Sequence, residues 1–165
     1  MESGRSHQES FIESSTHKFI LFDEPSEATL PTFKEVMKRN NCRDIVRCCE
    51  PNYDAALFTS DGINVHEMLF KDGSNPGEEL IDKWLQLLKD TYINNGKQKT
   101  TIGIHCIAGL GRTPVLVAIA LIEDGMKPLQ AVEFIRSKRR GAFNMPQINF
   151  LKKYKPSKKK SCIIM

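Results

Sequence analysis

The sequence lacks any apolar run long enough to span a bilayer. Its longest strictly apolar run, residues 115–122, has eight residues, whereas a membrane-spanning helix needs about 20. The first ten residues, MESGRSHQES, are polar and lack the apolar core of a signal peptide. We therefore expect residues 115–122 to form a buried helix and the chain to work in the reducing cytosol.

The sequence also lacks the cysteine patterns of metal sites. Its five cysteines form no C-x-x-C pair and no cysteine–histidine pattern with zinc spacing. Disulfide frameworks are rare in the cytosol, so each thiol requires its own explanation. The sequence predicts neither a bound metal nor a cofactor.

The sequence lacks an excess of basic residues outside the C-terminus. Residues 1–151 contain 18 basic and 20 acidic side chains, and the other six basic residues are lysines between positions 152 and 160. A nucleic-acid-binding domain would spread lysine and arginine over a folded face. We therefore do not expect nucleic acid as a partner.

The length and composition of the chain predict one α/β domain over residues 17–154. Residues 1–16 are polar and expected to be disordered, and residues 155–165 form a basic tail. Strand-like segments alternate with helical ones, which is typical of a mostly parallel sheet flanked by helices. The expected strands are 17–22, 43–49, 62–68 and 100–106, and the expected helices are 30–41, 78–96, 128–140 and 146–154, with one more that ends near residue 124.

The segment IHCIAGLGRTP (104–114) places a cysteine at the end of an expected strand and a loop before an expected helix. The N–H groups of such a loop and of the helix N-terminus form a site for an anion. We expect Gly109 and Gly111 to supply positive φ angles and close backbone approach, and Arg112 to bind two oxygens of a phosphate. The predicted substrate-binding residues are Ile107, Ala108, Gly109, Leu110, Gly111, Arg112 and Thr113.

Cys106 lies at the mouth of this predicted anion site. A helix N-terminus and a nearby cation stabilise a thiolate, and a thiolate that faces a phosphate can form a phosphocysteine intermediate. The spacing C-x5-R alone is a weak signal, with about 0.24 chance matches expected, but a glycine three residues after the cysteine lowers this to roughly 0.015. The structural alternative is a buried cysteine with an incidental arginine.

The motif HCIAGLGRTP resembles the signature of cysteine-dependent protein tyrosine phosphatases, and in particular that of the phosphatases of regenerating liver, a prenylated dual-specificity subgroup. The resemblance implies the cysteine-phosphatase fold and metal-independent hydrolysis of phosphomonoesters, with Cys106 as the nucleophile and Arg112 as the phosphate ligand. It extends from about residue 19 to residue 154 and is also carried by IVRCCEPNYD (45–54), FKDG (70–73), PVLVAIALIEDGMK (114–127) and AVEFIRSKRRGAFN (131–144).

The leaving group needs a proton donor, and the resemblance assigns this role to Asp72. On the residues alone, Asp72 and Gly73 form a plain turn signal, and Glu67 and Asp61 stay open as alternatives. The subgroup usually has Trp-Pro-Phe-Asp-Asp where this chain has MLFKD (68–72). The loop therefore has no tryptophan or proline to stiffen it.

Three further positions receive expectations of their own. Thr113 stands where the subgroup usually has alanine, and its hydroxyl can donate to the cysteine sulfur. Strand alternation directs His105 away from Cys106, which predicts either a structural role or a supporting contact behind the residues of the site. Gln147 is expected on the surface of a helix, with the positioning of a water molecule as the alternative.

Cys48 and Cys49 end a strand that is expected to lie beside the Cys106 loop. The resemblance implies a reversible disulfide between Cys49 and Cys106, and a resolving thiol beside a reactive one is typical of redox regulation. The alternative is that Cys48 and Cys49 are small core residues.

The last four residues, CIIM, match the C-a-a-X rule and predict farnesylation of Cys162. One lipid chain anchors a protein only marginally, and the six lysines upstream supply a second attraction, to an anionic membrane. The expected location is the cytoplasmic face of the plasma and endosomal membranes, or the nucleus without the lipid. A merely solvated tail is the alternative.

The loop side chains Ile107, Ala108 and Leu110 are apolar. Phosphatases of polyphosphoinositides tend to have lysines there, so we expect a phosphotyrosine-bearing phosphoprotein as the substrate. The resemblance also implies an alternative: a slow enzyme whose loop docks CNNM-type magnesium transport mediators. A second copy of the chain is a further candidate partner. An arsenate reductase or a sulfurtransferase would also use a cysteine loop, but neither explains the tail.

Overall fold

The computed structural model describes residues 9–108 and 110–157, and the expectations for Gly109 and Cys162 lie outside this part. Five strands form one sheet in the order β1-β2-β5-β3-β4. Strands β2, β5, β3 and β4 are parallel and β1 is antiparallel to β2, which confirms the predicted mostly parallel sheet. The strands are β1 (Glu9–Glu13), β2 (His17–Phe22), β3 (Asp44–Arg47), β4 (Asn64–Glu67) and β5 (Thr100–His105).

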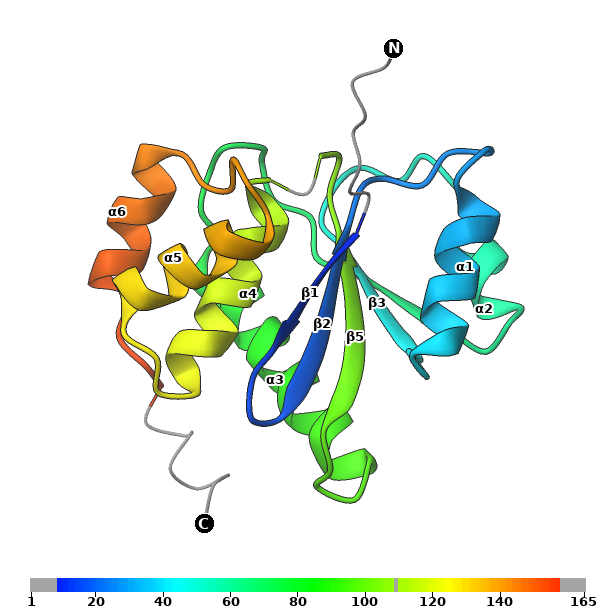
Figure 1. Cartoon of the computed structure of the whole chain (residues 1–165), viewed down its shortest axis with the longest axis horizontal. Helices are drawn as coiled ribbons and strands as arrows, with labels where there is room; N and C mark the ends of the chain where they lie inside the picture. The colour runs from blue at the N-terminus through cyan, green and yellow to red at the C-terminus, as the bar shows by residue number, and fades with distance from the viewer. Residues whose placement is uncertain (1–8, 109, 158–165) are drawn as a thin grey trace.

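Helices cover both faces of the sheet (Figure 1). Helices α1 and α2 lie on one side, and α4, α5 and α6 lie on the other. Trp84 of α3 donates its indole N–H to the Leu116 carbonyl of α4 at 2.8 Å, which fixes α3 on the α4 side. The helices are α1 (Leu30–Arg39), α2 (Ala56–Thr59), α3 (Glu78–Asn94), α4 (Arg112–Glu123), α5 (Pro128–Lys138) and α6 (Met145–Lys153).

Strand β1 shows that the disorder predicted for residues 1–16 is wrong for residues 9–13. Residues 9–13 pair with β2, and Ile12 is buried in the core while Phe11 is exposed. The segment looks disordered from its composition because its stability comes from backbone hydrogen bonds to β2 and from contacts with distant residues. Residues 1–8 lie outside the described part.

The apolar run of residues 115–122 lies within α4 and is buried in the core, as predicted. Every residue of α4 is buried, because α4 packs between the sheet and the helices α3, α5 and α6. On the other face, α1 approaches β5 closely. A Cβ at Gly103 would lie 3.0 Å from Met37 Sδ, so glycine is what allows this contact. None of the helices in the described ranges is both long and apolar enough to cross a membrane.

The carboxyl ends of the parallel strands meet at one edge of the sheet. The Cys48 N–H donates to the His105 carbonyl at 2.9 Å, so the segment after β3 lies beside the start of the Cys106 loop. The segment after β4 leads to residues 68–77 at the same edge. The fold therefore brings three connecting segments together where Cys106 lies.

The burial of His17 predicts how the free energy of unfolding depends on pH. Burial lowers the pKa of His17 to about 4, so below pH 6.5 the unfolded chain binds a proton that the folded chain does not. The free energy of unfolding is then highest above pH 6.5 and falls as the pH drops toward 4, by on the order of 3 kcal/mol for this one group. In urea titrations between pH 7.5 and 4.5, we expect His17→Gln to show a shallower pH dependence than wild type. An unchanged slope would contradict this assignment.

Candidate active site

The loop after β5 carries Cys106 at its start, and α4 begins at Arg112. Gly111 precedes α4 with φ −123°, so the predicted positive φ is wrong for this residue. A Cβ at Gly111 would lie 3.3 Å from Gln147 Nε2. Glycine is therefore suited to this position because the side chain of Gln147 packs against the backbone.

The carbonyl groups of the loop are bound from outside. The Ile107 carbonyl accepts from the Glu24 N–H at 2.9 Å, and the Ala108 carbonyl accepts from Arg139 Nη2 at 3.1 Å. A trans peptide directs its C=O and N–H to opposite sides, so the Ala108 N–H points away from Glu24. This arrangement leaves a backbone donor of the loop for an anion.

The guanidinium of Arg112 is buried at the edge of the sheet. Its Nη1 donates to the Phe70 carbonyl at 3.2 Å and lies 4.0 Å from Glu50 Oε1. Within the described residues, Nε has no hydrogen-bond acceptor. Buried donors normally have acceptors, so this atom fits a site that receives a polar ligand.

The structure brings Asp72 to Arg112 and leaves the alternative carboxylates engaged elsewhere. Asp72 Oδ1 lies 3.7 Å from Arg112 Nε, and the Asp72 side chain is 80% exposed. Glu67 accepts from Arg47 Nε at 3.0 Å. Asp61 pairs with Lys34 at 2.8 Å, on the side of α1. Asp72 is therefore the candidate best placed to reach a ligand held by Arg112.

The start of α6 is bonded to the loop that carries Asp72. Asn144 Nδ2 donates to the Gly73 carbonyl and Gln147 Nε2 to the Ser74 carbonyl, both at 3.2 Å. Gln147 is 1% exposed, so its expected surface position is wrong. Asn144 and Gln147 also form a reciprocal capping box, and their N-x-x-Q spacing is the signal that could have identified them.

Arg139 is a residue of the site that the sequence does not predict. Its guanidinium is buried and contacts Ala108 of the loop, Asp23 Oδ1 at 2.5 Å, Ser10 Oγ at 3.1 Å and the Leu21 carbonyl at 3.4 Å. In the sequence it stands in SKRRG (137–141), a charged run of the kind that is usually solvated. No local pattern indicates that this arginine is buried.

Cys48, Cys49 and Cys106 are buried in one cluster. Burial raises the pKa of the Cys49 thiol to about 12, so Cys49 is protonated at neutral pH. His105 faces the other side of β5, as predicted: its Nε2 lies 2.7 Å from the Tyr53 hydroxyl and its ring packs on Phe22. Burial lowers the pKa of His105 to about 4, so this side chain is neutral there.

The hydroxyl of Thr113 is buried at the first turn of α4. No described residue forms a hydrogen bond with its Oγ1. A buried hydroxyl without a partner has a donor to offer. It follows Arg112 directly, on the helix turn that succeeds the Cys106 loop.

Three comparisons with known proteins agree with this geometry. Residues 23–126 match a family described as "Polymorphic toxin system, DSP-PTPase phosphatase". The chain is 68% identical to the probable protein tyrosine phosphatase type IVA B of Dictyostelium discoideum over all of both chains. It is 46% identical to the PRL-1 phosphatase of Drosophila melanogaster over 88% of this chain and 81% of that protein.

The solved structures include a putative protein tyrosine phosphatase from Leishmania major. It superposes with a TM-score of 0.82 at 38% identity, over 90% of this chain and 99% of that chain. The resemblance stated from the Cys106 motif is thus confirmed at the level of the family. The chain belongs to the type IVA (PRL) family of protein tyrosine phosphatases.

Proposed function

We propose that the chain hydrolyses phosphotyrosine on proteins through a phosphocysteine at Cys106. The thiolate attacks the phosphorus, the bond to the phenolic oxygen breaks, and Asp72 donates its proton to that oxygen. Water then attacks the phosphocysteine, Asp72 accepts a proton, and the sulfur leaves as a thiolate. The observation that carries this proposal is the meeting of the Cys106 loop, Arg112 and Asp72 at one edge of the sheet.

The buried guanidinium of Arg112 and the loop N–H groups bind the non-bridging oxygens of the phosphate. Donors held in place before the reaction act most strongly where transition-state charge develops. The Phe70 carbonyl restricts how Arg112 can turn, which keeps its remaining donors directed toward the ligand.

The rim of the site favours an aromatic phosphoester over a polyphosphorylated lipid. Ile107, Leu69 and Leu110 are exposed there, with 52%, 47% and 38% of their surfaces accessible. Apolar side chains contact a phenyl ring well and offer no charge to additional phosphates. We therefore propose phosphotyrosine in a phosphoprotein as the substrate.

Trapping the intermediate tests the mechanism directly. The full chain is mixed with a ³²P-labelled aryl phosphate, quenched in acid and digested, and the label is located by peptide mapping. We expect it on Cys106, and equally so in a Cys49→Ser variant. A label on another residue, or turnover that survives in Cys106→Ser, would overturn the proposal.

The Thr113 hydroxyl predicts a kinetic effect. If it donates to the departing sulfur, Thr113→Ala slows the breakdown of the phosphocysteine more than its formation, by about fivefold to tenfold for one hydrogen bond. Rapid-quench kinetics should then show a larger burst of phenol and a slower steady state. Equal burst and steady-state rates in the two proteins would refute this role.

We also propose Cys49 as the redox partner of Cys106. Peroxide oxidises the Cys106 thiolate to a sulfenic acid, and the Cys49 sulfur displaces its oxygen as water to form a disulfide. Support comes from the shared buried cluster of the two residues. Mild peroxide should produce a reducible crosslink between positions 49 and 106 that Cys49→Ser abolishes. Recovery of Cys106 only as a sulfinic acid would count against the pairing.

We propose farnesylation of Cys162 and attraction of the lysine tail to the cytoplasmic face of the plasma and endosomal membranes. The support is the CIIM sequence and the six lysines before it. In cell fractionation, Cys162→Ser should move the protein to the soluble fraction. Unchanged membrane association would remove this proposal.

The exposed apolar rim also favours a second candidate, in which the loop docks a CNNM-type magnesium transport mediator and turns over slowly. Capture of that partner by Cys106→Ser and Asp72→Ala variants, compared with turnover of a small aryl phosphate by wild type, separates the two. Fast turnover that either variant abolishes supports the enzyme. Slow turnover with tight capture supports the docking module.

A further inference from the structure

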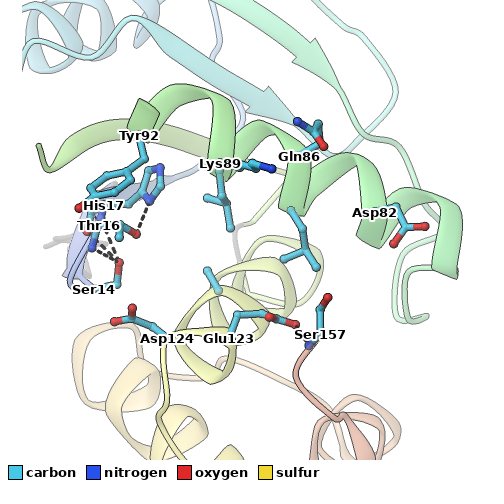
Figure 2. Close-up of a pocket in the computed structure, with 13 residues that line it drawn as sticks. Ser14, Thr16, His17, Asp82, Gln86, Lys89, Tyr92, Glu123, Asp124 and Ser157 are labelled. Atoms are coloured by element: carbon cyan, nitrogen blue, oxygen red, sulfur yellow. Dashed lines mark hydrogen bonds between the residues drawn. The ribbon is translucent and has the colours of Figure 1, made fainter. Parts of the chain in front are cut away.

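A cavity of about 400 Å³ lies between His17, at the start of β2, and Glu123, at the end of α4 (Figure 2). Cys106 follows the carboxyl end of β5, at the other end of the sheet. The cavity opens between α3 and α4, and residues before and at the start of β2 close one side of it. Nothing in the proposed chemistry uses it.

The cavity has an apolar floor and an acidic rim. Leu85 and Leu88 of α3 and Ala120 of α4 supply the apolar surface. The charged lining consists of three carboxylates, from Asp82, Glu123 and Asp124, and one ammonium group, from Lys89. Burial lowers the pKa of His17 to about 4, so this side chain is neutral at pH 7 and adds no positive charge to the cavity. The cavity therefore suits a segment that is both basic and apolar.

The chain itself leaves the folded domain along this wall. The Tyr154 hydroxyl and the Ser157 N–H both donate to Glu123 Oε2, at 2.6 and 2.8 Å. Ser157 is the last residue described and is part of the lining. The chain after α6 is therefore hydrogen-bonded to the wall of the cavity at Ser157.

The next eight residues have the matching chemistry. They read KKKSCIIM, with three lysines followed by a serine, a cysteine, two isoleucines and a methionine. An extended chain of this length reaches up to about 26 Å, which is enough to turn back over the cavity. The order also fits, because the lysines come first, next to the acidic rim, and the apolar residues can reach farther in.

We propose that this cavity is an intramolecular docking site for residues 158–165. The lysines lie against Asp82 and Asp124, and the terminal apolar residues cover Leu85 and Leu88. The docking belongs to the unmodified chain and does not depend on a lipid. If the proposed membrane anchoring also holds, an anionic bilayer and the cavity compete for the same segment.

A thiol placed in the cavity tests the proposal, because Cys162 is a natural partner for it. Full-length, unprenylated Cys106→Ser chain carries either Gln86→Cys, in the lining, or Lys153→Cys, on the exposed surface of α6. Oxidised glutathione is the oxidant, and the disulfides are mapped by peptide analysis. Position 153 is far nearer to Cys162 along the chain, so loop closure alone favours the control.

We expect Gln86→Cys to crosslink to Cys162 at least about tenfold faster than Lys153→Cys, which corresponds to about 1.4 kcal/mol of preference for the cavity. Adding Asp82→Lys should remove this advantage, whereas Glu79→Lys, the same charge change on α3 outside the lining, should not. A rate no higher than that of the control overturns the proposal. A crosslink that forms only between two chains overturns it as well and identifies a second copy as the occupant.

A measurement on the unaltered chain guards against variants that misfold. Carbodiimide joins lysines to carboxylates in direct contact, and the proposal expects lysines 158–160 joined to Asp82 or Asp124 at low salt. Absence of these products, with other crosslinks in the domain present, contradicts the docking. Membrane release by Cys162→Ser is measured separately, so failure of the docking and failure of the anchoring are distinguishable.

Discussion

Replacing Arg112 with lysine should lower kcat/KM for an aryl phosphate by at least about 10²–10³-fold, or 3–4 kcal/mol of transition-state stabilisation. Lysine keeps the positive charge but cannot bind two oxygens in one plane while also donating to the Phe70 carbonyl. Because the side chain is buried, water cannot replace the missing donors. The loss should therefore be nearly as large as that of an uncharged replacement.

The measurement is steady-state kinetics on wild type, Arg112→Lys and a matched Arg39→Lys variant. Arg39 lies on α1 and pairs on the surface with Glu35 at 3.5 Å, so its replacement should leave turnover within about twofold. Circular dichroism checks that each variant is folded. A loss below tenfold for Arg112→Lys would mean that a point charge suffices, and the proposed geometry of phosphate binding would be wrong.

Replacing Asp72 with asparagine should have an effect that depends on the leaving group. Asparagine keeps the shape of the side chain but has no proton to give, and general acid catalysis contributes about 10²–10⁴-fold. We expect that loss with phenyl phosphate in kcat/KM, which reports the cleavage of the phosphoester and not the later hydrolysis of the phosphocysteine. With 4-nitrophenyl phosphate, whose phenolate leaves without a proton, the loss should be much smaller.

Two matched variants separate Asp72 from the other carboxylates considered. Glu67→Gln and Asp61→Asn remove acids that are paired with Arg47 and Lys34. Neither should show a dependence on the leaving group, even where the lost pairing lowers stability. If the effect of Glu67→Gln depends on the leaving group and that of Asp72→Asn does not, the assignment of Asp72 as the general acid is wrong and Glu67 holds that role.

Much of the fold could be predicted because local patterns are strong in this chain. The apolar spacing of residues 78–96 predicts α3 closely, and the switch from an apolar run to a glycine-containing loop predicts the end of β5. The placement of Cys106 directly after β5 and of Arg112 at the start of α4 also follows from local order, since a strand, a loop and a helix leave few arrangements. The parallel sheet follows from the alternation of strands and helices.

The rest depends on contacts between residues distant in sequence. Strand β1 forms because β2 has an unpaired edge, which the composition of residues 1–16 does not reveal. Gln147 and Arg139 look like surface residues until the segments around them are placed. Gly111 has a negative φ, so the turn itself does not require glycine there. Glycine suits the position because the side chain of Gln147 packs against its backbone.

Arg139 joins parts of the protein that lie far apart in the sequence. One guanidinium binds Ser10 of β1, Asp23 after β2 and Ala108 of the loop. Through Arg139, the amino-terminal strand thus helps to hold in place a loop that begins almost a hundred residues later. A tag or a deletion near residue 10, remote from any reacting atom, would weaken the contact of Arg139 with Ser10 and with it the support of the loop. An assay on a protein with such an altered N-terminus would then underestimate the rate of turnover.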